Sequence, residues 1–133
     1  MGAVPYLNTP LTTIQDMVNQ AIAAINAASG VFSPLVAATA VAGAVTAQGT
    51  KLQITTEALA TAAAASYVLT LTDAAINGNS MVFVSCNYGT SNAGEPSVHK
   101  VTPAPGSASI TIRNDSAAVA VNGTLVLNVL IVN

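Results

Sequence analysis

Residues 67–72 read YVLTLT and residues 108–113 read ASITIR, two stretches in which apolar and polar side chains alternate. A period of two places successive side chains on opposite faces of a β-strand, so each stretch predicts a strand with one face in a core. From Lys51 onward the pattern recurs in short segments that are separated by turn-forming residues. This arrangement predicts a mainly β protein, an antiparallel β-sandwich or jelly roll, and not a series of βαβ units.

Turn signals and longer apolar runs define the rest of this β region. Asn77-Gly78-Asn79 predicts a turn, and Asn122-Gly123 predicts a second hairpin. Met81–Cys86 and Thr124–Val132 predict strands that are apolar on both faces. The Ala-rich segment Glu57–Ala65 is compatible with a short helical turn or with a linker.

The last of these strands needs cover on both faces. No later element follows Thr124–Val132 in the sequence, so we expect another subunit to bury its outer face. Leu125 and Leu127 are the candidate self-association residues on this strand.

An amphipathic helix is predicted over Thr12–Ala28, after an extended arm that Pro5 and Pro10 bracket. Apolar residues recur at alternating spacings of three and four, which is an a/d heptad pattern, and Gly30 follows where a helix C-terminal glycine belongs. This stripe also fits a helix that packs on its own domain, and the pattern leaves both interpretations open. The candidate self-association residues are Leu11, Ile14, Val18, Ala21 and Ile25.

We therefore expect three parts along the chain. Residues 1–30 form the N-terminal arm and the one short helix, and residues 31–50 form an Ala/Val/Thr-rich connector. This segment is predicted as extended chain or loose strand pairing, and its use is as a connector or as a strand that lies along a partner. Residues 51–133 form a jelly-roll-like β domain.

The composition bears on possible partners. Only eight of the 133 residues are charged, 6% against about 25% in typical soluble domains, and the net charge is -2. A surface so poor in charge favours a chain that hides much of its outside against other copies or another protein. Three basic residues cannot neutralise the phosphates of a nucleic acid or of anionic lipids. The charge-free stretch Met17–Thr50 is mostly Ala interrupted by polar residues, so we expect neither a nucleic-acid partner nor a membrane span.

Residues that carry chemistry are few. His99 is the only histidine and Cys86 the only cysteine, and one of each cannot complete a zinc site within a chain. Cys86 is expected as a small buried hydrophobe. No G-x-S-x-G motif is present, and the aromatic residues are too few for a sugar cleft around paired carboxylates. The sequence therefore predicts no enzyme, no cofactor and no metal. The acidic residues outside the helix are expected to keep turns and loops soluble; they are Glu57, Asp73, Glu95 and Asp115.

One polar, glycine-containing segment presents an aromatic side chain. Asn87, Tyr88, Gly89 and Thr90 form a candidate exposed contact loop, which would touch a receptor or a sugar. In the alternative interpretation Tyr88 folds back over the sheet edge, because a single tyrosine makes a thin binding site.

Four segments of the β region carry a family resemblance, in their low charge, their richness in Ala, Thr, Val, Asn and Gly, and their apolar last strand. They are Tyr67–Thr72, Ile76–Val84, Ser107–Asn114 and Asn122–Asn133. On these segments Thr61–Asn133 resembles the jelly-roll modules of tailed-bacteriophage virion proteins, namely capsid decoration (cement) proteins and head or tail fibres.

The resemblance implies a non-enzymatic virion structural protein, a decoration or cement protein that binds the outer shell as a homo-oligomer. The alternative is a receptor- or glycan-binding tip module of a phage fibre. The implied partners are the chain itself and the major capsid protein or another virion protein. A homotrimer is favoured over a dimer, partly because Ile occupies core positions of the helix stripe. The implied location is the outer capsid surface, after assembly in the host cytoplasm.

Overall fold

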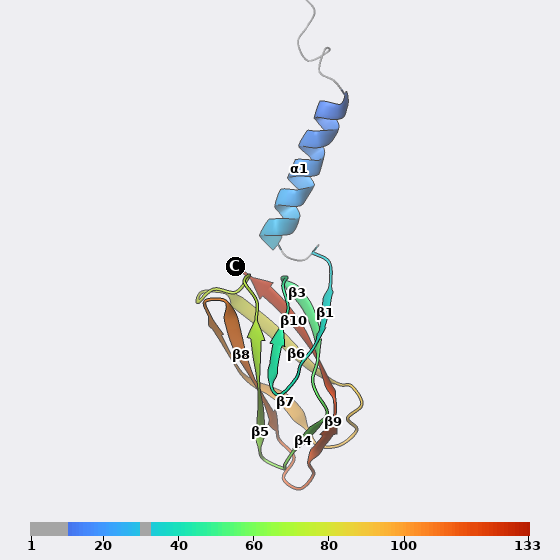
Figure 1. Ribbon diagram of the computed structural model, residues 1–133, viewed down its shortest axis with the longest axis vertical. Coiled ribbons are helices and arrows are strands. Elements are labelled where there is room, and N and C mark those ends of the chain that lie inside the picture. The colour runs from blue at the N-terminus through green and yellow to red at the C-terminus, as the bar shows by residue number, and fades with distance from the viewer. Residues whose placement is uncertain (1–10, 30–32) are drawn as a thin grey trace, which may run out of the picture.

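The computed structural model describes residues 11–29 and 33–133, so the expected N-terminal arm lies outside the described residues. Helix α1 (Leu11–Ser29) comes first and extends beyond one end of a β-sandwich (Figure 1), which confirms the predicted helix and the mainly β fold. The strands of the described part are β1 (Val36–Thr39), β2 (Ala44–Thr46), β3 (Lys51–Thr55), β4 (Leu59–Thr61), β5 (Ser66–Thr72), β6 (Met81–Tyr88), β7 (Pro96–Ala104), β8 (Ser107–Asn114), β9 (Val121–Gly123) and β10 (Leu125–Val132).

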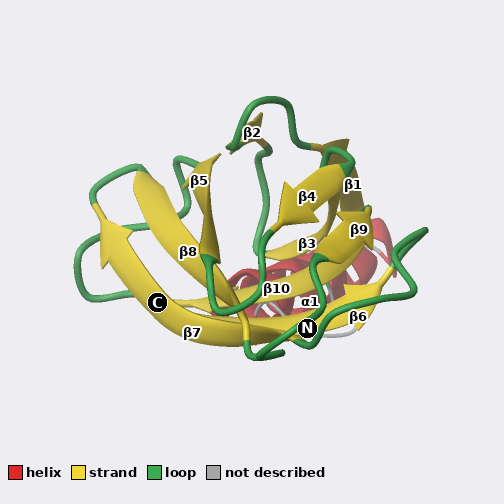
Figure 2. Cartoon of the chain, turned by 90° about the horizontal axis from the view of Figure 1, so that it is seen from below, coloured by secondary structure: helices red, strands yellow, loops and turns green. Residues whose placement is uncertain are grey.

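Two four-stranded sheets form the sandwich. Sheet A has the order β1-β3-β10-β6 and sheet B has the order β2-β5-β8-β7, while β4 and β9 pair at the end away from α1 (Figure 2). The pairs β1–β3 and β2–β5 are parallel, and the other neighbours are antiparallel. The sheets are therefore mixed, which corrects the expectation of a purely antiparallel sandwich.

The core follows from the alternation in the sequence. Leu69 and Leu71 on β5 are fully buried, and so is Ile110 on β8, which lies opposite Leu69. The facing sheet contributes alternate residues of β10 and β3, because every second side chain points inward. Truncating one of these buried Leu or Ile side chains to Ala costs about 2–5 kcal/mol.

Residues 36–46, expected as part of a connector, belong to the sandwich. β1 pairs with β3 and β2 pairs with β5, so this segment supplies one edge of each sheet. Val41 and Ala44 exchange two backbone N–H···O hydrogen bonds of 2.9 and 3.1 Å, and this turn takes the chain from sheet A to sheet B. The segment Glu57–Ala65, whose sequence is compatible with a helical turn or with a linker, contains the short strand β4.

The two Asn-Gly pairs have different outcomes. Asn77-Gly78-Asn79 lies in a turn that the Ser80 N–H closes by donating to the Asn77 carbonyl at 3.1 Å. The hairpin predicted at Asn122-Gly123 is wrong, because both residues lie in β9. They pair with Ala60 and Leu59 instead of turning the chain into β10.

The free edge of sheet B is protected against pairing with another strand. β7 carries a register shift between Val98 and Lys100, and Pro96 and Pro103 lie within it. Prolines, a lysine and a bulge on an edge strand all oppose edge-to-edge association. Contacts with other copies are therefore more favourable on faces of the molecule than along β7.

Candidate functional site

The first candidate surface is the apolar stripe of α1. Its described side chains, residues 13–24, are all exposed, so none of them packs against the β domain of its own chain. The interpretation in which this helix packs on its own domain is therefore wrong for these residues. The side chains of Leu11 and Ile25 lie outside the described ones. The predicted stripe residues found exposed are Ile14, Val18 and Ala21.

The stripe is wider than the heptad pattern indicates. Met17 and Ile22 are 63% and 51% exposed, and neither belongs to the predicted a/d set. At 3.6 residues per turn, the arc from Met17 through Ile14 and Val18 to Ile22 covers about 140° of the helix surface. A two-stranded seam uses a narrower stripe. The helix therefore presents an apolar face broad enough to contact more than one neighbouring helix.

The two candidates on β10 are placed differently from the prediction. Leu125 and Leu127 are 0% exposed and lie in the core, so they offer no surface to another subunit. The outward side chains of this strand are the partly buried ones that alternate with them. The expected uncovered outer face exists, but its members are Val126, Asn128, Leu130 and Val132.

A row of side chains crosses the outer face of sheet A near α1. Leu130 on β10 lies opposite Phe83 on β6 and opposite Lys51 on β3. Leu35 immediately precedes β1, which pairs with β3. Phe83 is 57% exposed and Leu35 is 52% exposed. We call Leu35, Lys51, Leu130 and Phe83 the apolar row, since Lys51 is its only charged member.

The apolar row borders a shallow hollow of about 410 Å³. One step further along the strands, Gln53, Asn128 and Ser85 occupy the same outer face, and the Gln53 Nε2 donates to the Asn128 Oδ1 at 3.3 Å. The outer face of sheet A is therefore apolar beside α1 and polar beyond it. The hollow is lined by Leu35, Lys51, Leu52, Phe83, Val84, Ser85, Asn128, Val129 and Leu130.

The predicted contact loop lies at the opposite end of the sandwich (Figure 1). Asn87 and Tyr88 are the last residues of β6, while Gly89 and Thr90 begin the loop that follows. Tyr88 is 52% exposed, and its hydroxyl donates to the Gly94 carbonyl at 2.6 Å. The ring is thus held across the loop and keeps one half open to solvent.

The loop after β6 is fixed to the residue that precedes β10. The Thr90 N–H donates to the Thr124 Oγ1 at 2.9 Å, and the Thr124 N–H donates to the Thr90 Oγ1 at 2.9 Å. Gly89 approaches so closely that a Cβ there would lie 2.5 Å from the Thr124 Oγ1. The Asn92 N–H donates to the Asn122 side chain at 3.2 Å. These bonds hold the loop in one conformation. Such a loop suits a contact surface that binds without changing shape, because little conformational entropy is lost on binding.

His99 and Cys86 lie on strands of different sheets, β7 of sheet B and β6 of sheet A. His99 is exposed at the register shift of β7, and Cys86 is half-buried on β6, where burial raises the pKa of its thiol. A raised pKa makes the thiol a poor nucleophile. Within residues 11–29 and 33–133, no three His, Cys, Asp or Glu side chains come close enough to hold a metal ion.

Two of the four acids expected as solubilisers, Glu57 and Asp73, instead accept hydrogen bonds within the fold. Glu57 accepts a hydrogen bond from the Tyr67 hydroxyl at 2.9 Å and one from the Gly43 N–H at 2.8 Å. Burial, and then this bond to the Glu57 carboxylate, raise the pKa of Tyr67. Asp73 is 0% exposed, and its carboxylate accepts the backbone N–H groups of Ala75 at 2.9 Å and of Gly49 at 3.3 Å.

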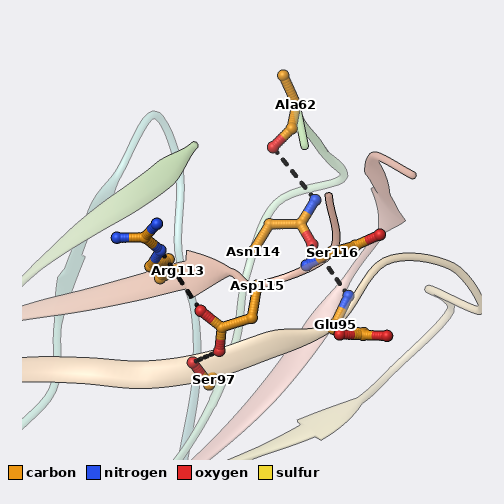
Figure 3. A network of polar contacts seen from close by, with 7 residues as sticks. All are labelled: Ala62, Glu95, Ser97, Arg113, Asn114, Asp115 and Ser116. Atoms are coloured by element: carbon orange, nitrogen blue, oxygen red, sulfur yellow. Dashed lines mark hydrogen bonds and ion pairs between the residues drawn. The ribbon is translucent and has the colours of Figure 1, made fainter. Parts of the chain in front are cut away.

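A buried asparagine joins the loops at the end away from α1 (Figure 3). The Asn114 amide donates to three backbone carbonyls, those of Thr61, Ala62 and Val119, at 3.2, 3.1 and 2.8 Å. Its oxygen accepts the backbone N–H groups of Glu95 at 2.9 Å and of Ser116 at 3.2 Å. This single side chain ties three separate loops to the end of β8.

The next residue makes a looser contact at the surface. Asp115 pairs with Arg113 at 3.4 Å and accepts a hydrogen bond from the Ser97 hydroxyl (Figure 3). Both charged side chains of the pair are nearly half exposed, so solvent screens their attraction.

No family model matches this sequence, and neither a curated protein nor a solved structure does. Among residues 11–29 and 33–133, no helix combines the length and the apolar character that crossing a membrane requires.

Proposed function

We propose that this chain is a non-enzymatic virion structural protein that self-associates through α1. The observation that carries the proposal is the exposed apolar arc of the helix. Ile14, Met17, Val18 and Ile22 are each 47–63% exposed, although their chain has a core that could have covered them. Most helical stability in proteins comes from the packing of an apolar face and not from propensity, so this face is suited to pack against other copies of the helix.

The residues of the arc favour three chains over two. Ile14 and Val18 are β-branched at adjacent core positions, and Ile at both kinds of core position shifts coiled coils toward trimers. Met17 and Ile22 flank those positions, and a third helix covers flanking residues that a two-stranded coil leaves in water.

The assignment to a phage virion rests on the resemblance of Thr61–Asn133 to decoration and fibre modules. The jelly-roll assignment is part of the same proposal. Its support is that the strands of the two four-stranded sheets alternate between sheet A and sheet B from β1 to β7, and only the β7–β8 hairpin stays within one sheet. On this view the chain binds the outer surface of the capsid, and its shell partner is the major capsid protein or another virion protein.

A second candidate function is a receptor- or glycan-binding tip. Tyr88 favours it, because its half-exposed ring lies on a loop fixed by hydrogen bonds at the end of the sandwich away from α1. In an assembly held together by the helices, that end remains free to meet a ligand.

Two aspartates placed in the apolar arc test the self-association. Ile14→Asp with Val18→Asp puts charges into the helix contact, and we expect the variant to sediment as a monomer where the wild type sediments as three chains. Asn19→Asp with Gln20→Asp is the matched control, because it adds the same charges to exposed positions outside the arc. We expect this control to remain associated. A wild-type chain that is a stable monomer at micromolar concentration would overturn the proposal.

The virion assignment has its own test. We expect purified particles of the source phage to contain the chain, detected by mass spectrometry, and expect the helix variant to be depleted from them. Particles that lack the wild-type chain would refute a virion role and leave self-association standing.

A further inference from the structure

Apolar side chains are unevenly distributed over the outer faces of the sandwich. On sheet A the apolar row and its hollow lie at the end that leads into α1. On sheet B the outer face carries small hydroxyl side chains, with Thr70 opposite Ser109 and Thr72 opposite Ser107. Val68 is the large apolar residue exposed there. One face near the helix is therefore suited to lie against protein, while the other is suited to water.

The chain connecting helix and domain decides which surface meets a neighbour. Six residues lie between Ser29 and Val36, and the seven steps from one residue to the other reach at most about 25 Å. When helices of several copies associate, each domain starts within that distance of the helix contact. Tethering on this scale gives an effective concentration in the millimolar range, at which even a modest apolar contact forms. The surfaces held closest together are those at the α1 end, where the apolar row lies.

We propose that the hollow beside Phe83 is the contact between the β domains of neighbouring copies of this chain. The inference rests on the proposed self-association through α1 and identifies a second surface of the same assembly. The apolar row runs across the sheet from Leu35 at one edge to Phe83 at the other. A cyclic arrangement brings the Phe83 edge of one copy to the Leu35 edge of the next, and such head-to-tail contacts close into a ring.

The single charge of the row is compatible with this contact. Lys51 is exposed and lies at the level of Leu130. A lysine lays its aliphatic stem along apolar surface and keeps its amine in water, so it can border a dry contact without being buried.

The test uses full-length variants and sedimentation equilibrium. Phe83→Ser with Leu130→Ser removes two of the three apolar side chains of the row, and we expect association to weaken at least tenfold. Val68→Ser is the matched control, because Val68 is 50% exposed on the outer face of sheet B, close to the 57% of Phe83. We expect the control to associate like the wild type. Each serine is also introduced alone, so that a folding failure of the pair, seen by circular dichroism, leaves two variants that test the contact.

The outcomes separate this inference from the function on which it rests. A monomeric wild type overturns both. A wild type of several chains, together with folded Phe83→Ser and Leu130→Ser variants of unchanged affinity, overturns the domain contact and leaves the helix contact intact. Weakening by Phe83→Ser but not by Val68→Ser supports a second copy in the hollow. Equal weakening by both variants shows a general loss of stability and refutes a specific contact at the row.

Discussion

Asn114 provides the most direct test of how the end of the sandwich away from α1 is held together. Its side chain is 1% exposed and links the end of β8 to three loops. Replacing it with Ala removes every one of these links at once and adds no new group. We expect a large loss of stability without a change of fold.

The magnitude follows from the hydrogen bonds. The variant loses five hydrogen bonds, three from the amide N–H groups and two to the amide oxygen. The amide has only two N–H donors for its three carbonyls, so two of these bonds share one N–H and are counted together, which leaves four. Each buried bond contributes about 1 kcal/mol net, so the expected loss is about 4 kcal/mol. That is a large part of the stability of an ordinary domain, which is about 5–15 kcal/mol.

Urea unfolding at one fixed protein concentration measures this loss, since association also affects apparent stability. Asn79→Ala is the control, because Asn79 is exposed in a turn where its backbone N–H, not its side chain, makes the bond to Asn77. We expect the control to change the unfolding free energy by less than about 0.5 kcal/mol. A loss below about 1 kcal/mol for Asn114→Ala would refute the role of this side chain as the link.

Two further predictions concern packing and pH. Gly94→Ala places a Cβ 2.7 Å from the Val121 side chain at φ +79°, whereas Gly106→Ala has a similar φ of +77° and open space around it. We therefore expect Gly94→Ala to lower the urea midpoint clearly more, and equal losses would contradict the close approach. The raised pKa of Tyr67 means that the folded state holds the phenol proton more tightly than the unfolded state. Stability from this group is complete below the free phenol pKa of about 10 and declines as pH rises above it. We expect Tyr67→Phe to remove that part of the decline, compared by urea unfolding on either side of that pH.

The alternating strands and the helix could be predicted because their patterns are local. β5 and β8 each bury one set of alternate residues, and this requires only a single covered face. Thr124–Val132 is different, since it is apolar on both faces. The pattern then does not indicate which set of alternate residues points into the core, and this is why the prediction for Leu125 and Leu127 is wrong.

Other elements depend on distant partners. β1 and β2 are three or four residues long and take their strand geometry from the parallel pairing with β3 and β5. Asn122-Gly123 resembles a hairpin turn locally, but its pairing with β4 and the bond from the Asn92 N–H hold it in β9, where Gly123 has a φ of +78°. The helix pattern also contains the signal for Met17 and Ile22. Both residues lie within the width of a full apolar face, although they are outside the a/d positions.

The two candidate functions draw on opposite ends of one molecule. The apolar surface lies on α1 and on the nearby row that ends at Phe83, whereas the half-exposed Tyr88 follows five residues later on the same strand. Five residues of a β-strand span about 16 Å, so β6 alone connects a surface suited to protein contact with one suited to display. Association at the first end leaves the second uncovered and repeats Tyr88 once per chain. Three copies of a thin site bind a repetitive ligand far more tightly than one copy does. Self-association through α1 is therefore what would make a single tyrosine per chain sufficient for recognition.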